Sequence, residues 1–199
     1  RTYRAGEVLV GAMHAAGAVR AACASPVVGV MTPTGGAFPI AALGAWMVGK
    51  VVVPLNYLLK RDELAYVIRD CGMDTLVTVR PMLSHLGYEP DVRSTICLDE
   101  LDMKGVPEPV RPACAADDDL GVILYTSGTT GRPKGVMLTH GNIRSNIEQC
   151  EAFIDVGPKD VALGILPQFH SFGMTVLTLL PLSCGMRAVW SARFVPSKV

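Results

Sequence analysis

The residues best suited to chemistry lie in one short stretch, TSGTTGRPK, from Thr126 to Lys134. Glycines at 128 and 131 let backbone N–H groups approach an anion closely. Four Ser and Thr hydroxyls add further donors, and Lys134 adds a positive charge that can follow a moving phosphate. This combination predicts a loop that binds phosphate groups.

Three interpretations of this stretch compete. Glycine, serine and threonine are ordinary turn residues, so it could be a surface loop without a ligand. A Walker-type phosphate loop needs the pattern GxxxxGK[ST] in front of a helix. Here Lys134 is followed by Gly135 and a β-rich run, so spacing and context both argue against that loop. The third interpretation is a phosphate clamp between two strands.

The stretch Thr126–Lys134 resembles the AMP-binding signature of the adenylate-forming superfamily at all nine positions. This superfamily comprises acyl-CoA synthetases, peptide-synthetase adenylation domains and luciferases. The region from Val27 to Gly72 and the GVMLTHGNI that follows the signature are also similar, so the resemblance covers nearly the whole chain. A further motif, LPQFHSFGM, looks more like that of fatty-acyl and aryl CoA ligases than that of peptide-synthetase domains.

The resemblance implies an AMP-forming acyl-CoA synthetase. In such enzymes a carboxylate attacks the α-phosphate of ATP, pyrophosphate leaves, and the acyl group passes from the adenylate to coenzyme A. The implied partners are ATP, Mg²⁺, coenzyme A and a small carboxylic acid, for which the FHSFG form favours a medium or long fatty acid. Two alternatives stay open: an enzyme that delivers the acyl group to a carrier protein or lipid acceptor, and a truncated, non-catalytic nucleotide-binding module.

The resemblance also implies the residues of the site. Lys134, Thr130 and His170 are the candidate catalytic residues, and Thr130 is also the candidate ligand of Mg²⁺. We expect His170 to form the wall and gate of the acyl pocket and not a general base, because adenylation removes no proton from an ionised acid. The residues implied at the ATP phosphates are Thr126, Ser127, Gly128, Thr129, Thr130, Gly131 and Lys134, and those implied at the acyl pocket are Phe169, His170, Phe172 and Gly173.

Several motifs of the superfamily are not among these 199 residues. They are a YGxTE-like segment near adenine and the metal, a YxTGD-like segment at the ribose, and a small C-terminal domain with an adenylation lysine. We therefore expect the chain to be the first part of the large N-terminal domain, with the C-terminal domain absent and with little or no activity on its own.

The elements that must position these residues alternate between helix and strand. Such alternation predicts an α/β fold, with parallel or mixed sheets flanked by helices. Apolar runs without polar alternation, such as KVVVPLN, indicate strands buried on both faces. The pattern predicts helices over 4–22, 35–50, 60–72 and 172–183, a short helix between 79 and 94, a helix from about Asn142, and strands over 27–33, 50–56, 74–79, 94–99, 120–126, 135–139, 161–167 and 186–190.

A change of composition marks the best internal boundary. Residues 104–119 are rich in proline and end in a run of aspartates, which is typical of a surface linker. We therefore expect one subdomain portion over 1–103 and a second over 120–199, which holds the phosphate loop and the acyl-pocket motif.

Charge and cysteine content exclude several other classes of protein. With 18 basic and 18 acidic residues the net charge is zero, which argues against a nucleic-acid partner. Six widely spaced cysteines without a CxxC pair favour reduced thiols and a cytoplasmic location. The charge-free run from Ala21 to Gly49 is interrupted by prolines, so we expect no transmembrane segment. Peripheral membrane association stays open, and the oligomeric state cannot be inferred from the sequence.

Overall fold

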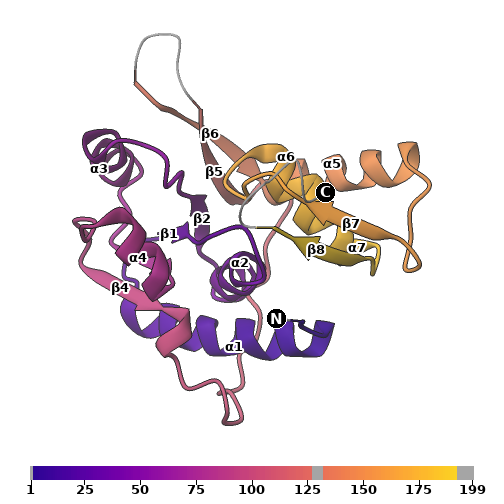
Figure 1. Ribbon diagram of the computed structural model, residues 1–199, viewed down its shortest axis with the longest axis horizontal. Coiled ribbons are helices and arrows are strands. Elements are labelled where there is room, and N and C mark those ends of the chain that lie inside the picture. The colour runs from indigo at the N-terminus through magenta and orange to yellow at the C-terminus, as the bar shows by residue number, and fades with distance from the viewer. Residues whose placement is uncertain (1, 127–131, 192–199) are drawn as a thin grey trace.

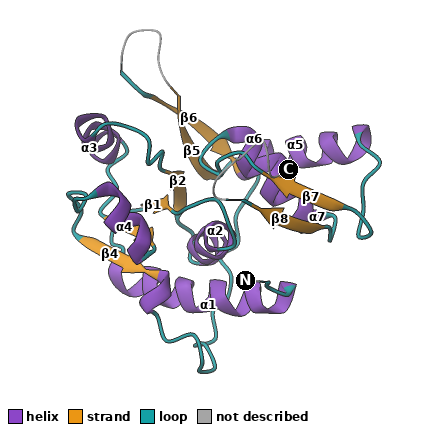
Figure 2. Ribbon diagram, viewed as in Figure 1, coloured by secondary structure: helices purple, strands orange, loops and turns teal. Residues whose placement is uncertain are grey.

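The computed structural model describes residues 2–126 and 132–191. Helices and strands alternate and form a six-stranded sheet and a smaller two-stranded sheet (Figures 1 and 2). This arrangement confirms the predicted α/β class. The helical elements are α1 (Ala5–Ala22), α2 (Ala37–Met47), α3 (Arg61–Asp70), α4 (Arg80–Leu86), the 3-10 turn η1 (Leu98–Glu100), α5 (His140–Phe153), α6 (Ser171–Met174), the π-helical η2 (Thr175–Leu179) and α7 (Leu180–Ser183). The strands are β1 (Val27–Met31), β2 (Val51–Pro54), β3 (Thr75–Thr78), β4 (Ser94–Cys97), β5 (Leu120–Thr126), β6 (Lys134–Thr139), β7 (Val161–Gly164) and β8 (Arg187–Trp190).

The large sheet has the strand order β4-β3-β1-β2-β5-β6. Its first five strands are parallel, and β6 pairs with β5 antiparallel. Helices α1 and α2 pack on one face, and α3 and α4 pack on the other. Neighbouring residues of β2 therefore enter opposite cores, Val52 with α1 and α2 and Val53 with α3 and α4, which explains the unbroken valine run.

Small residues let the two helices of the first face approach closely. Ala12, Ala15, Ala16 and Val19 of α1 are fully buried, whereas Leu9 on the same helix is exposed. A Cβ on Gly44 of α2 would lie 2.7 Å from the carbonyl oxygen of Ala12. Glycine is needed here because the backbones of α1 and α2 are in contact. This contact holds α2 between α1 and the sheet.

Strands β5 and β6 flank the predicted phosphate loop. Strands β5 and β6 form an antiparallel hairpin in which Tyr125 is opposite Gly135 and Thr126 is opposite Lys134. Segment 127–131 joins the two strands, and its residues lie outside the described part of the chain. The hairpin extends beyond the rest of the sheet (Figure 1).

The predicted helix over 172–183 is present but contains a π-helical turn. Pro181 has no N–H, so the carbonyl of Leu177 loses its usual donor four residues later. The indole Nε1–H of Trp190 in β8 donates to this carbonyl at 3.0 Å. Strand β8 pairs with β7, and a Cβ on Gly164 would collide with the Trp190 ring. The Trp190 hydrogen bond thus joins this helix to the small sheet. Pro181 leaves the carbonyl free to accept it, and Gly164 makes room for the indole ring.

The expected linker, 104–119, contains no helix or strand, and all of its residues are described. The N–H of Ala113 donates to the carbonyl of Met47 at 2.9 Å, which holds the segment against the end of α2. Strand β5, which follows the segment, joins the same sheet as β1 to β4. The division into 1–103 and 120–199 stays a prediction.

The charge-free run from Ala21 to Gly49 contains the end of α1, all of β1 and α2. Among the residues that the structure describes, no helix combines the length and apolar character needed to cross a membrane. All six cysteines are free thiols.

Candidate functional site

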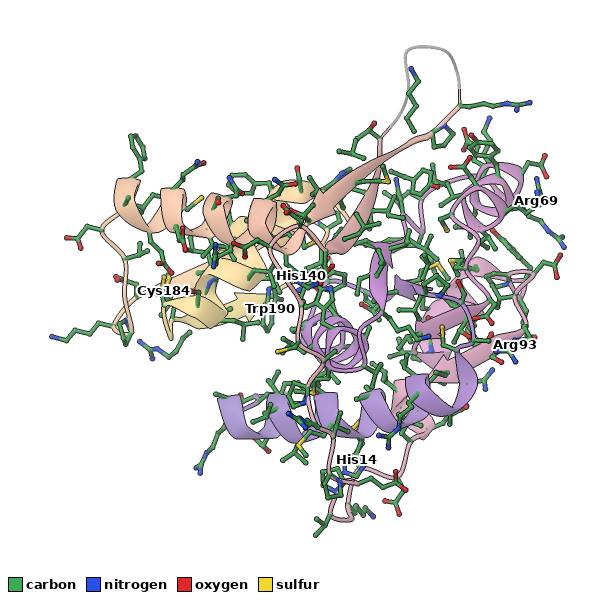
Figure 3. The ribbon with its side chains drawn as sticks, turned by 180° about the vertical axis from the view of Figure 1, so that it is seen from behind. His14, Arg69, Arg93, His140, Cys184 and Trp190 are labelled. Atoms are coloured by element: carbon green, nitrogen blue, oxygen red, sulfur yellow. The ribbon has the colours of Figure 1, made fainter. Side chains whose placement is uncertain are left out.

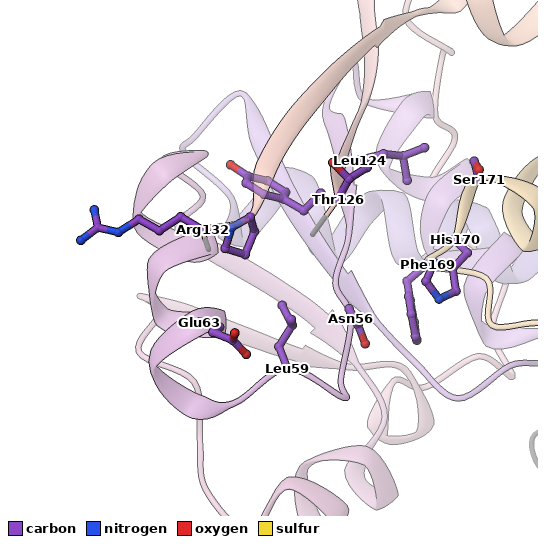
Figure 4. Close-up of a pocket in the computed structure, with 11 residues that line it drawn as sticks. Asn56, Leu59, Glu63, Leu124, Thr126, Arg132, Phe169, His170 and Ser171 are labelled. Carbon is purple, nitrogen blue, oxygen red and sulfur yellow. The ribbon is translucent and has the colours of Figure 1, made fainter. Parts of the chain in front are cut away.

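A cavity of about 450 Å³ opens beside the hairpin (Figure 4). Three separate segments form its wall: the connection from β2 into α3, the two arms of the hairpin, and the FHSFG motif. The lining residues are Asn56, Leu59, Glu63, Leu124, Tyr125, Thr126, Arg132, Pro133, Phe169, His170 and Ser171.

Strand direction explains why these segments meet. Parallel strands point their carboxyl ends to the same edge of a sheet, and ligands of open α/β sheets bind outside that edge. Strand β2 ends at Pro54, just before Asn56, and its parallel neighbour β5 ends at Thr126. The cavity therefore occupies the position where this architecture places a ligand.

Two aromatic rings fix the FHSFG side of the cavity. The Phe169 side chain is buried, and its ring meets the Tyr57 ring edge-on with centroids 5.0 Å apart. His170 is exposed at the N-cap of α6, and its imidazole lies 4.6 Å from the Phe169 ring, centroid to centroid. His170 is thus at the mouth of the cavity, with Phe169 behind it.

The structure brings together three of the candidate residues, Thr126, Phe169 and His170. Lys134 begins β6 opposite Thr126, is exposed, and is not part of the cavity wall. Phe172, with 52% of its surface exposed, also lies outside that wall. The remaining phosphate candidates, Ser127, Gly128, Thr129, Thr130 and Gly131, fall outside the described residues.

Gly173 has a visible packing role. A Cβ at this position would lie 2.1 Å from the carbonyl oxygen of Pro167. The absence of a side chain lets the LPQFHSFGM motif fold back on itself, so that Phe169 and His170 face the cavity. The proposed contact of Gly173 with an acyl group stays a prediction.

The sequence reasoning missed the wall formed by Asn56, Leu59 and Glu63. The available signal was the position of Asn56 directly after a buried strand, where ligand-binding residues of α/β sheets gather. The Glu63 carboxylate accepts a hydrogen bond of 3.0 Å from the backbone N–H of Lys60 and thereby caps α3. In the sequence, Glu63 looked like an ordinary residue of a helix N-terminus, and nothing in the pattern indicated that it also lines the cavity.

Tyr125 of the hairpin is hydrogen-bonded to the Asp70 carboxylate of α3. The Tyr125 hydroxyl donates to Oδ2 of Asp70 at 2.6 Å. Burial, followed by this hydrogen bond, raises the pKa of the Tyr125 phenol well above its ordinary value. The Arg132 guanidinium lies over the Tyr66 ring, 5.6 Å from its centroid, and its side chain extends away from the cavity in Figure 4.

His14 and His140 are not part of the cavity wall. His14 on α1 contacts the carbonyl oxygen of Gly105 at 3.1 Å, on the side of the molecule far from the hairpin (Figure 3). His140 begins α5 and meets the Trp46 ring edge-on. Within 2–126 and 132–191, no three His, Cys, Asp or Glu side chains gather in a way that could hold a metal ion.

The comparisons with known proteins agree with this geometry. The AMP-binding enzyme family matches residues 8–198. The chain is 30% identical over 183 residues to the long-chain-fatty-acid–CoA ligase FadD13 of Mycobacterium tuberculosis, covering 86% of this chain and 36% of that protein. It is 31% identical over 188 residues to the sulfoacetate–CoA ligase of Cupriavidus necator, covering 85% and 35%.

Among solved structures, ATP-bound MatB from Rhodopseudomonas palustris superposes with a TM-score of 0.80 at 27% identity. The match covers 97% of this chain and 41% of that chain. The chain thus spans little more than a third of the length of the curated relatives. With the family match over nearly all of its residues, the chain belongs to the AMP-binding enzyme family, within the adenylate-forming superfamily.

Proposed function

We propose that this protein activates a carboxylic acid with ATP and transfers the acyl group to coenzyme A. The acid's carboxylate oxygen attacks the α-phosphorus, the bond to the β-phosphate breaks, and pyrophosphate leaves. The thiol of coenzyme A then attacks the acyl carbon, and AMP leaves. The observation that carries this proposal is the single cavity shared by the hairpin of the TSGTTGRPK stretch and the FHSFG motif.

The hairpin supplies the phosphate end of the proposed site. Pyrophosphate departure moves negative charge outward, and positioned N–H groups, hydroxyls and a cation stabilise that charge. Thr126 and Lys134 stand opposite each other at the two ends of the loop, so both can serve the same phosphates. We assign the same role to Ser127, Gly128, Thr129, Thr130 and Gly131.

Mg²⁺ is part of this proposal. It prefers hard oxygen ligands and is commonly held by one or two protein oxygens together with substrate phosphates. The cavity wall offers oxygens of this class on Asn56, Glu63 and Thr126, and the Thr130 hydroxyl is the proposed ligand. When bound with ATP, the ion would neutralise phosphate charge.

The FHSFG motif supplies the acyl end. Leu59, Leu124 and Phe169 give the cavity an apolar side that suits a fatty acid, our proposed substrate class. Phe172 and Gly173 complete the proposed acyl pocket. His170 at the mouth acts as wall and gate, so His170→Ala should raise KM for the acid more than KM for ATP and leave the shape of the pH–rate profile unchanged.

The experiment uses the protein produced from its whole gene. It is incubated with ATP, Mg²⁺, coenzyme A and acids of increasing chain length, together with sulfoacetate and an aryl acid. We expect AMP, pyrophosphate and acyl-CoA in equal amounts, with the highest kcat/KM for a medium or long fatty acid. Formation of ADP, or no acid-dependent turnover of ATP, would contradict the proposal.

Two further arms test the remaining expectations. Acyl-adenylate that forms but does not react with coenzyme A would favour a carrier protein or lipid acceptor. Residues 1–199 alone should show no turnover, because the superfamily's adenine and ribose motifs are not among them. We also propose a cytoplasmic location, which the six free thiols support.

A further inference from the structure

The hairpin that carries the proposed phosphate loop leaves its sheet before it reaches the loop. Strand β5 pairs with β2 at Val122, opposite Val52. From Ile123 to Thr126 its partner is β6, from Met137 to Lys134. Figure 1 shows the paired strands continuing past β2. An isolated two-stranded hairpin is only marginally stable. The outer part of this hairpin, here called the hairpin arm, therefore needs another contact to hold Thr126 and Lys134 in place.

Tyr125 connects the arm to α3. Its ring lies across Gly135 of the opposite strand, where an added Cβ would be 3.2 Å from the Tyr125 Cζ atom. The glycine therefore leaves the phenol free to reach the Asp70 carboxylate, 2.6 Å from the hydroxyl oxygen. Asp70 is the last residue of α3.

The same carboxylate also contacts the β6 side of the hairpin, indirectly through Tyr66. Asp70 Oδ1 accepts a hydrogen bond of 3.2 Å from the Tyr66 hydroxyl. The Tyr66 ring in turn carries the Arg132 guanidinium on its face, 5.6 Å from the centroid. Tyr125 precedes segment 127–131 and Arg132 follows it, so α3 holds the chain on both sides of that segment.

Helix stability does not explain an aspartate at this position. A negative charge in the last turn of a helix is unfavourable, because the helix dipole is negative there. Asp70 is exposed, so it fills no space in the core. Its side chain instead accepts hydrogen bonds from two phenols, Tyr66 and Tyr125.

We propose that Asp70 is a positioning residue for adenylation, acting through the Tyr125 hydroxyl to fix the hairpin arm. The inference rests on the proposed function and adds a residue to it. Thr126 and Lys134 stabilise departing pyrophosphate only when they are held at the correct distance, and a small displacement of such groups is costly. Asp70 supplies that restraint without touching the substrate.

The test compares Tyr125→Phe, Asp70→Ala and the double variant with the matched control Tyr88→Phe in the whole protein. The buried Tyr88 hydroxyl has no hydrogen-bond partner among the described residues, so its loss breaks no such bond. We expect kcat for adenylation to fall about tenfold in each of the first two variants. Both variants remove the Tyr125–Asp70 bond, and Asp70→Ala also removes the Tyr66–Asp70 bond, so the double variant should fall little below Asp70→Ala. KM for the acid should stay within about twofold.

Two structural readouts separate positioning from folding. Amide hydrogen exchange in 120–126 and 134–139 should quicken in Tyr125→Phe and Asp70→Ala, and not in Tyr88→Phe. The melting temperature of Asp70→Ala should stay close to that of wild type, because the relief of an unfavourable charge at the end of α3 offsets the loss of hydrogen bonds from two partly exposed phenols. Activity losses that follow a lower melting temperature would overturn the proposal, as would multiplicative losses in the double variant or unchanged kcat and exchange.

The exchange readout also keeps this inference distinct from the proposed function. If the wild-type protein lacks acid-dependent adenylation, the proposed function fails and Asp70 has no adenylation role. If wild type is active and the arm does not loosen, only the positioning role of Asp70 fails.

Discussion

The backbone N–H of Gly35 donates a hydrogen bond of 2.8 Å to Oε1 of Gln168 and so joins the loop after β1 to the FHSFG motif. The other end of the same amide donates to the Thr178 hydroxyl at 2.9 Å, and that hydroxyl donates to the carbonyl of Gly173 at 2.8 Å. Gln168 is 3% exposed and Thr178 is fully buried, so the bond between them forms out of water, while the Gly35–Gln168 bond is partly buried. The amide holds the segment on which Phe169 and His170 stand.

Replacing Gln168 with leucine should destabilise the fold. The change removes the donor to the buried Thr178 hydroxyl and the acceptor of the partly buried Gly35 N–H, and losing a buried hydrogen-bond partner costs about 1–3 kcal/mol. Denaturant unfolding measures the effect. Gln149→Leu on the exposed side of α5 is the matched control, and equal unfolding free energies for the two variants would contradict the prediction.

Lys134→Met should lower kcat for adenylation by about 10- to 100-fold, the range expected for loss of a charged hydrogen-bond partner. The side chain is exposed at the start of β6, so the melting temperature should stay close to that of wild type. Lys104→Met in the 104–119 segment is the control and should keep wild-type kcat. An active Lys134→Met enzyme would remove this residue from the phosphate site.

Gly173→Ala should disturb the FHSFG motif strongly. The new Cβ would meet the Pro167 carbonyl oxygen at 2.1 Å, and such overpacking costs about 1–3 kcal/mol or forces the backbone to shift. A Cβ on Gly157 has no heavy atom within 4 Å, so Gly157→Ala is the control. Thermal unfolding compares the two, and the prediction is wrong if both melt at the same temperature.

Asp74 predicts a specific acid sensitivity. Burial raises its pKa, but hydrogen bonds from Thr75, Cys23 and other donors outweigh burial and lower the pKa from 3.8 to about 2. The unfolded chain therefore binds the proton more readily, and the stability that Asp74 contributes is complete above about pH 4 and is lost as the pH falls toward 2.

Asp74→Asn should remove that dependence. The variant should unfold at lower denaturant concentration than wild type at pH 7, and the difference should shrink between pH 4 and pH 2. Asp91→Asn, on the exposed loop after α4, is the control. A difference that stays constant across this pH range would assign the stability to something other than the charge.

The sequence predicted what local patterns determine. The apolar pattern predicted a helix over 4–22, where α1 is found, and the valine run identified β2 as a strand buried on both faces. These features depend on neighbouring residues alone. For the same reason the order of helices and strands along the chain was predicted before the structure.

Contacts between distant segments were not accessible in this way. Asn56 and Glu63 join the cavity wall because β2 and β5 are parallel neighbours, which periodicity does not reveal. The Asp70–Tyr125 bond depends on where the hairpin leaves the sheet, and the Trp190–Leu177 bond depends on β8 lying beside the helix. Each requires the complete fold.

The most direct test of the central claim is exchange of labelled pyrophosphate into ATP by the whole protein. This exchange reports reversal of acyl-adenylate formation and needs no coenzyme A. We predict exchange that depends on both Mg²⁺ and a carboxylic acid and that falls at least about tenfold in Lys134→Met. Exchange that is absent with every acid, or that proceeds equally without acid, would contradict the assignment of adenylation to this site.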